Sequence, residues 1–181
     1  MSNETNFQID LPSGFHYEKP SPDGPVKIWL TGDQFFKDLW DFFITFEHIF
    51  SDPKLKICCL KRGAGAHVTV IGNGARRRDI YTMQVGSYDE NMEQGEVIFA
   101  EPLPPGLGLS KDGEGWVFVD DLSDTGTTIS AIRVRWPKAK ILTVYAKPQG
   151  EKFPDGFYMK IPDIWVVFPG ETPWDRFIPN N

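Results

Sequence analysis

Acidic, hydroxyl and glycine residues cluster between positions 120 and 128, directly after the apolar run Trp116–Val119. The cluster reads Asp-Asp-Leu-Ser-Asp-Thr-Gly-Thr-Thr. Gly126 lets the backbone approach a ligand closely, and the neighbouring threonine hydroxyls are hydrogen-bond donors. Backbone N–H groups at the start of a helix attract anions. The cluster therefore predicts a phosphate-binding loop, one that lacks the lysine of a Walker loop.

Asp124 differs from the rest of this loop, because a carboxylate beside a phosphate is repelled. We expect it to face another part of the ligand, where it suits proton transfer. Asp120 and Asp121 suit hydrogen bonds from a sugar diol, or a Mg²⁺ ion held through water. The structural alternative is a strand followed by a turn whose Asp and Thr only cap a helix. The spacing of the acids excludes a phosphatase-type Asp-x-Asp strand end.

Three elements are expected to position this loop. Trp116–Val119 is short, aromatic and β-branched, which predicts a buried strand. Residues 127–136 have helical apolar spacing before Pro137, and Lys140–Ala146 predicts the next strand. Such a strand–helix–strand unit is parallel and right-handed, and ligands bind at the carboxyl ends of its strands. The segment 120–128 is expected to be the loop at such an end.

The stretch 116–128 resembles the motif of type I phosphoribosyltransferases that binds phosphoribosyl pyrophosphate (PRPP): an apolar run, two acids, an apolar residue, then x-Asp-Thr-Gly-x-Thr. The resemblance implies an α/β fold, a mostly parallel twisted sheet flanked by helices, with a flexible hood loop. It implies Asp124 as the catalytic base and Mg²⁺ as cofactor at Asp120 and Asp121. The PRPP-binding residues that it implies here are Asp120, Asp121, Ser123, Asp124, Thr125, Gly126, Thr127 and Thr128.

A second, basic loop, Lys61-Arg62-Gly63, follows the predicted strand Ile57–Leu60. It offers cations and N–H groups at a strand end, as a pyrophosphate requires. By resemblance, Lys61, Arg62 and Gly63 form the pyrophosphate part of the PRPP site; the alternative is an ordinary turn with exposed basic side chains. The predicted hood loop spans residues 86–95. The family usually has an arginine a few residues after the start of this loop, and this chain has Gln94 there.

Residues 114–175 are similar to bacterial xanthine–guanine phosphoribosyltransferases, notably in VRWPKAK, YAKP and IPDIWV. Lys147 follows a predicted strand, where a cation can donate to an exocyclic oxygen, and Trp165 offers a face for stacking. The resemblance implies that Lys147 reads a 6-oxo group, that Trp165 stacks on the purine and that the Val166 carbonyl accepts from it. Surface lysines and core tryptophans are the commoner cases.

The chain has 181 residues and a net charge of −6, which argues against a nucleic-acid-binding face. We expect an extended N-terminal arm over residues 1–26 and one phosphoribosyltransferase domain over residues 27–181. The run Arg76–Arg78 is expected to be a solvated surface turn. Two adjacent cysteines, Cys58 and Cys59, with no apolar leader and no membrane-spanning run, indicate a reducing, cytoplasmic location.

The segment 31–50 predicts an unusually apolar helix. Thr31–Gln34 has capping-box spacing, and residues 34–50 leave only a narrow polar stripe. Such a helix is covered on most sides. Two interpretations stay open: a core helix, or a helix that also packs on a second subunit in a homo-oligomer.

The predicted function is purine salvage, the Mg²⁺-dependent transfer of 5-phosphoribosyl from PRPP to a 6-oxopurine. Xanthine, guanine and hypoxanthine all stay open as substrates. The expected partners are these small molecules, with no nucleic acid and no integral membrane association. Two alternatives remain: a phosphoribosyltransferase for adenine or a pyrimidine, and a non-catalytic PRPP- or nucleotide-binding regulator on the same fold.

Overall fold

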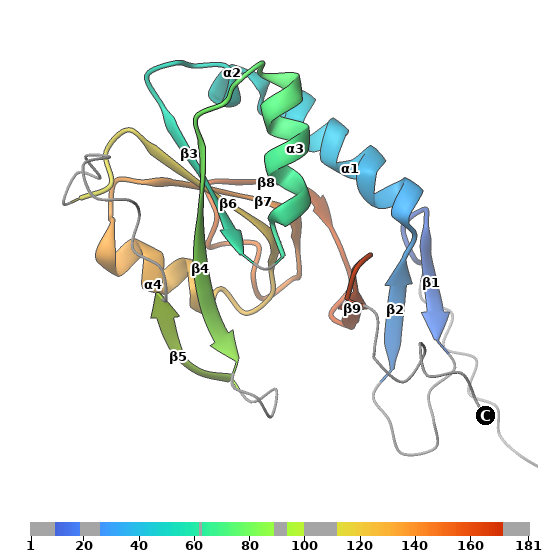
Figure 1. Cartoon of the computed structure of the whole chain (residues 1–181). Coiled ribbons are helices and arrows are strands. Elements are labelled where there is room, and N and C mark those ends of the chain that lie inside the picture. The colour runs from blue at the N-terminus through green and yellow to red at the C-terminus, as the bar shows by residue number, and fades with distance from the viewer. Residues whose placement is uncertain (1–9, 19–25, 62, 89–93, 100–111, 172–181) are drawn as a thin grey trace, which may run out of the picture. The chain divides into compact units, whose positions relative to one another are not determined.

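The computed structural model describes residues 10–18, 26–61, 63–88, 94–99 and 112–171 (Figure 1). The chain divides into two compact units. The larger unit is Lys37–Asp163, and the smaller unit combines Met1–Phe36 with Ile164–Asn181. Among the described residues, no helix has the length and apolar character needed to cross a membrane.

A six-stranded sheet in the order β5-β4-β3-β6-β7-β8 is the framework of the larger unit. Its strands are β3 (Lys56–Lys61), β4 (Ile80–Tyr88), β5 (Gln94–Phe99), β6 (Trp116–Ser123), β7 (Lys140–Ala146) and β8 (Gly156–Lys160). Neighbouring strands pair in parallel, except that β4 and β5 are antiparallel. The mostly parallel sheet predicted from the sequence is thereby confirmed.

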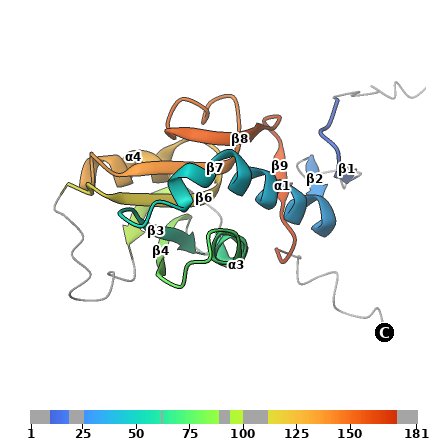
Figure 2. The same ribbon diagram turned by 90° about the horizontal axis from the view of Figure 1, so that it is seen from above.

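Helices cover both faces of this sheet because the two helical crossovers within the described residues run in opposite directions. Helix α3 (Gly65–Gly74) joins β3 to β4, whereas α4 (Thr127–Arg135) joins β6 to β7. Right-handed crossovers in opposite directions place their helices on opposite faces (Figure 2). Helix α1 (Gly32–Thr45) packs beside α3, since the Phe42 and His67 rings lie 6.2 Å apart.

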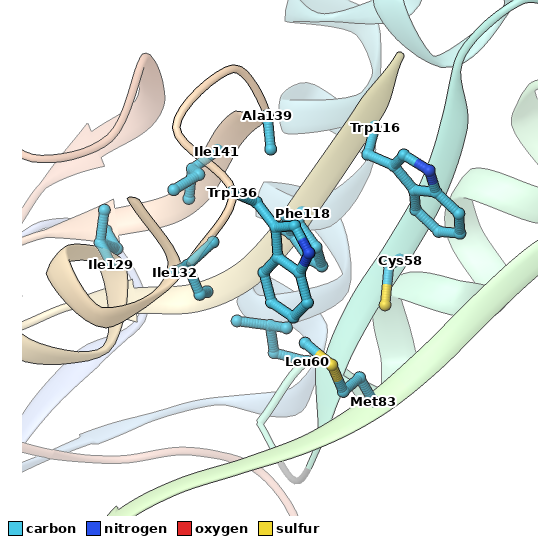
Figure 3. Close-up of a cluster of buried hydrophobic side chains, with 10 residues drawn as sticks. All are labelled: Cys58, Leu60, Met83, Trp116, Phe118, Ile129, Ile132, Trp136, Ala139 and Ile141. Atoms are coloured by element: carbon cyan, nitrogen blue, oxygen red, sulfur yellow. The ribbon is translucent and has the colours of Figure 1, made fainter. Parts of the chain in front are cut away.

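The apolar core beneath α4 anchors the helix that follows the predicted phosphate loop (Figure 3). The Trp136 ring stacks on Phe118 with centroids 5.1 Å apart, and Phe118 in turn stacks on Trp116 at 6.4 Å. Burial of these rings is the main force holding α4 on the sheet. The cluster consists of Cys58, Leu60, Met83, Trp116, Phe118, Ile129, Ile132, Trp136, Ala139 and Ile141.

Strand β6 is longer than its apolar run predicts. It continues to Ser123 because β7 supplies partners along the whole length, with Asp120 opposite Thr143 and Ser123 opposite Ala146. The prediction that Asp120 and Asp121 lie in a loop is therefore wrong. Both acids lie within the second half of β6, and the turn is confined to residues 124–126.

The predicted hood loop, residues 86–95, is partly strand. Strand β4 continues to Tyr88 and β5 begins at Gln94, so the two ends of the segment pair antiparallel, with an irregularity between Gly86 and Tyr88. The pairing satisfies backbone N–H and C=O groups of both strands. The polar sequence of this segment has no periodicity and therefore does not predict these strands. Residues 89–93 and 100–111 lie outside the described part of the chain.

The predicted helix 34–50 is two helices, α1 and the short α2 (Glu47–Phe50), separated at Phe46. Phe46 has φ −111° and ψ 21°, outside the helical region. Just before the break, the Thr45 hydroxyl donates to the Asp41 carbonyl at 2.8 Å, a contact that bends helices. The predicted cap is present: the backbone N–H of residue 34 donates to the hydroxyl of residue 31 at 3.4 Å.

Arg77 is not the solvated side chain that the run Arg76–Arg78 suggests. Its side chain is only 8% exposed, and its guanidinium donates to three backbone carbonyls within residues 50–55. Two further hydrogen bonds join it to the Asp79 carboxylate. The prediction of a wholly solvated turn is wrong at this position, because the segment 50–55 ends in carbonyls that need a donor.

The smaller unit contains a three-stranded sheet in the order β1-β2-β9. Its strands are β1 (Phe15–Glu18), β2 (Lys27–Leu30) and β9 (Trp165–Val167). Strands β1 and β2 are antiparallel, whereas β2 and β9 are parallel. Part of the predicted N-terminal arm is thus a paired strand, and Phe15 within it is buried.

Candidate active site

The turn between β6 and α4 has the backbone geometry of an anion-binding loop. Gly126 adopts φ 80°, and a side chain there would lie 2.0 Å from the Phe153 ring. Glycine is therefore required both by conformation and by space. The hydroxyls of Thr125 and Thr127 are 2.8 Å apart, and Thr128 follows in the first turn of α4. The first turn of α4 contains no acidic residue, so the partial positive charge of its N–H groups is not offset there.

Ser123 ties this turn to the segment after β7. Its buried hydroxyl donates to the Gly150 carbonyl at 2.9 Å, and its own carbonyl accepts from the Lys147 N–H at 3.0 Å. The side chain is thereby used within the fold. A contact between Ser123 and PRPP would use its backbone.

Asp120 and Asp121 lie side by side, both half-buried, at the end of β6. The backbone N–H of Asp121 donates to the Asp120 carboxylate at 3.1 Å, and that of Leu122 donates to the Asp121 carboxylate at 2.8 Å. Burial, followed by the negative charge of Asp121, raises the pKa of Asp120 well above its usual range. A hydroxyl donor or a cation placed here would relieve this repulsion. Within the described residues, no group of three or more metal-binding side chains gathers.

The end of β3 meets this acid pair. A side chain at Gly63 would place its first carbon 2.0 Å from an oxygen of the Asp121 carboxylate. The predicted pyrophosphate loop and the predicted ribose-binding acids are therefore neighbours, as parallel pairing of β3 with β6 requires. Lys61 is exposed at the last position of β3. Arg62 lies outside the described residues.

Asp124, predicted to be the catalytic base, and Lys147, predicted to read the 6-oxo group, form an ion pair. The Lys147 ammonium lies 2.9 Å from Oδ2 of Asp124. Lys147 is 5% exposed, so the alternative of an ordinary surface lysine does not hold. A buried ammonium is stabilised by a carboxylate partner, and Asp124 supplies one. The sequence indicated both residues without indicating that they touch.

Gln149 and Asp163 complete the surroundings of Asp124, and sequence reasoning missed both. The Gln149 amide nitrogen donates to Oδ1 of Asp124 at 3.1 Å and to Oδ1 of Asp163 at 2.8 Å. Asp163 also lies 3.8 Å from the Lys147 ammonium. The sequence signals were the position of Gln149, two residues after Lys147, and that of Asp163 within the IPDIWV stretch.

Trp165 and Val166, the other predicted purine contacts, belong to the smaller unit. They open β9, which pairs with β2 through Val166 opposite Ile28. Trp165 is 39% exposed, whereas Val166 is buried. The indole is thus not a core side chain, and β9 is an edge strand of its sheet.

Comparison with known proteins agrees with this fold. No protein-family model matches the chain. A xanthine-guanine phosphoribosyltransferase of Desulfotalea psychrophila is 37% identical over 120 residues, which are 64% of this chain and 69% of that protein.

Solved structures share the fold at lower identity. A purine phosphoribosyltransferase from Pyrococcus horikoshii superposes with a TM-score of 0.62 and 22% identity, over 81% of this chain and 95% of that one. A xanthine-guanine-hypoxanthine phosphoribosyltransferase from Helicobacter pylori gives 0.60 and 18%, over 82% and 96%. These structures share the type I phosphoribosyltransferase fold, and the 37% identical relative shows that the chain belongs to the xanthine–guanine phosphoribosyltransferase family.

Proposed function

We propose that this phosphoribosyltransferase transfers the 5-phosphoribosyl group of PRPP to N9 of a 6-oxopurine, giving a nucleoside monophosphate and pyrophosphate. The observation that carries the proposal is the partly buried Lys147–Asp124 pair beside the glycine turn. It joins a donor suited to an oxo group with a proton acceptor, next to a phosphate site. The relative named a xanthine-guanine phosphoribosyltransferase supports the same substrate class.

The turn 124–128 is proposed to hold the 5-phosphate of PRPP. Backbone N–H groups at the start of α4 and the clustered threonine hydroxyls supply donors without a charged side chain. The left-handed Gly126 brings the backbone close to the anion. Binding at this end would fix the ribose over the carboxyl end of β6.

Asp120 and Asp121 are proposed to face the ribose hydroxyls and Mg²⁺. A pair of adjacent carboxylates fits this ion, which takes one or two protein carboxylates and fills its remaining positions with water and phosphate oxygens. When bound, Mg²⁺ supplies charge neutralisation to the pyrophosphate leaving group. Burial and the neighbouring charge of Asp121 raise the pKa of Asp120, and a bound cation would favour its ionised form.

The Lys61–Gly63 segment is proposed to bind the pyrophosphate. Its proximity to Asp121 through Gly63 puts it within reach of a group attached to C1 of the ribose. Lys61 supplies a positive charge, and the backbone of this turn supplies N–H donors. Arg62 is proposed to bind the same pyrophosphate.

Lys147 is proposed to donate to the 6-oxo group of the purine. An ammonium has three N–H donors, so Lys147 can serve a substrate oxygen while it keeps Asp124. The 6-amino group of adenine is itself a donor and would leave the ammonium unsatisfied. Trp165 is proposed to stack on the base and the Val166 carbonyl to accept from it.

Chemistry at this site would depend on positioning and electrostatics. Departure of pyrophosphate leaves positive charge on the ribose, as in other glycosyl transfers. As the base attacks, its acidity rises, and Asp124 would take the proton that it releases. The phosphate and base sites together would hold the two substrates in line.

A base-panel assay tests the proposal. Pyrophosphate release from PRPP and Mg²⁺ is measured with xanthine, guanine, hypoxanthine and adenine in turn, and again with EDTA. We expect release with at least one 6-oxopurine, little with adenine, and none without the metal. Release with adenine alone would favour the alternative substrate class. PRPP binding without release with any base would favour a non-catalytic regulator.

Two further predictions accompany this function. Phe36, Trp40 and Ile44 are exposed at four-residue spacing on α1, which supports the predicted homo-oligomer. Light scattering during size-exclusion chromatography measures the subunit number. A reducing, cytoplasmic compartment also stays a prediction, and the free, buried thiols of Cys58 and Cys59 are compatible with it.

A further inference from the structure

We propose that Gln149 is a positioning residue for the reaction, holding the Asp124 carboxylate in the orientation required for proton transfer. The inference rests on the proposed role of Asp124 as the base. Asp163 acts one step further out, by orienting the Gln149 amide. Neither residue is expected to touch PRPP.

The two oxygens of Asp124 are held by two different donors. Lys147 lies 2.9 Å from Oδ2, and the Gln149 amide nitrogen lies 3.1 Å from Oδ1. Contacts on both oxygens fix the plane of a carboxylate, which one contact leaves free to rotate. The Asp124 side chain is 29% exposed, so packing alone does not hold it.

The Gln149 amide has only one chemically sensible orientation. Both groups beside its nitrogen are carboxylate oxygens, those of Asp124 and Asp163, and carboxylates accept hydrogen bonds. The amide nitrogen has two hydrogens, one for each of them. Asp163 at 2.8 Å is the shorter contact and fixes the direction of the other.

The backbone beneath Gln149 is pressed onto the end of β6. A side chain at Gly150 would lie 2.1 Å from the Ser123 carbonyl oxygen and 2.4 Å from that of Asp124. The Ser123 hydroxyl donates to the Gly150 carbonyl across the same contact. The segment that carries Gln149 is therefore packed directly against the backbone of Asp124, the residue that Gln149 orients.

Gln149 holds the Asp124 carboxylate in a way that does not change when the purine binds. Lys147 then also donates to the purine oxygen, so its hydrogen bond to Asp124 is altered. A neutral amide holds the other oxygen without adding charge. Its loss should therefore lower kcat while leaving the affinity for PRPP, bound at the threonine turn, nearly unchanged.

A double-mutant cycle tests this inference. We expect Gln149→Ala to lower kcat about tenfold, the value of one hydrogen bond to a charged group, with PRPP KM changed by no more than about twofold. Gln149→Glu, which has the same shape but repels both carboxylates, should lose at least as much. In an Asp124→Asn background, Gln149→Ala should cause no further loss, because the group that it positions is gone.

Glu151→Ala is the matched control, since Glu151 lies in the same turn as Gln149 but its carboxylate forms an ion pair with Lys160. It should keep wild-type kcat. Equal losses from Gln149→Ala with and without Asp124, or wild-type kcat in Gln149→Ala, would overturn the positioning role while the function stood. A wild-type enzyme that releases no pyrophosphate, or an Asp124→Asn variant of full kcat, would overturn both proposals.

Discussion

The Lys147 ammonium lies 2.9 Å from the Asp124 carboxylate, although the two residues are 23 positions apart in the chain. The contact joins the end of β7 to the turn after β6, and these strands are neighbours in the sheet. It couples the residue proposed to read the base with the residue proposed to take its proton. A substrate oxygen that engages Lys147 is thereby brought beside Asp124.

Lys147→Met should raise the KM for a 6-oxopurine about 10- to 100-fold, since a hydrogen bond from a charged donor is lost. It should also lower kcat, because Asp124 loses the partner of Oδ2. PRPP KM should change little. Steady-state kinetics with each substrate varied separately measures the three effects, and Lys140→Met, at the exposed first residue of β7, is the control. Equal changes in both KM values would contradict a base-reading role.

Asp124→Asn should lower kcat by about 10²- to 10⁴-fold, the usual contribution of a general base. Titration calorimetry should find PRPP affinity unchanged, because the Asp124 carboxylate contacts Lys147 and Gln149. The control is Asp112→Asn, which removes a surface ion pair with Lys138. A variant that turned over at the wild-type rate would show that another group accepts the proton.

Gly63→Ala should reduce kcat/KM for PRPP by about 10²-fold, the effect of displacing a ligand-binding group by an ångström. Its methyl group would lie 2.0 Å from the Asp121 carboxylate, which must move. Gly65→Ala is a close control, because a methyl group there meets nothing within 4 Å. Similar kinetics in the two variants would mean that the proximity of Gly63 to Asp121 has no functional weight.

His67 should make the protein less stable in acid. Burial lowers its pKa from 6.5 to about 3, so the folded protein keeps the ring neutral. Between these values the unfolded chain binds a proton that the folded chain does not, and stability falls as pH falls. From pH 7 to 5, wild type should lose about 2 kcal/mol more than His67→Leu. Urea unfolding at both pH values measures this difference, and exposed His48→Leu should behave as wild type.

Arg77→Ala should lower the free energy of unfolding by about 2 to 4 kcal/mol, because three carbonyls within residues 50–55 lose their donor. Arg78→Ala removes an exposed neighbour and should stay within roughly 0.5 kcal/mol of wild type. Denaturant midpoints at constant slope give both values. Matching effects would show that the guanidinium contacts are energetically unimportant.

Local pattern and the family resemblance that it carries indicated the fold class and the loop at the centre of the candidate site. The apolar run of β6, the acids after it and the Thr-Gly-Thr-Thr segment lie within thirteen consecutive residues, so their order in the chain is their order in space. The helix after Gly126 and the strand at Lys140–Ala146 followed from periodicity and from Pro137. Parallel pairing then placed Gly63 near the acids of β6, as the topology demands.

Only the tertiary structure decided how the side chains pair. The ion pair of Lys147 with Asp124 and the two contacts of Gln149 join different strand ends, and no spacing along the chain encodes such distances. Arg77 looked like one of three solvated arginines until the carbonyls facing it were known. The same holds for Asp120, which the sequence places in a loop but which pairs with Thr143 of β7. The length of a strand depends on the neighbouring strand and not on hydrophobicity alone.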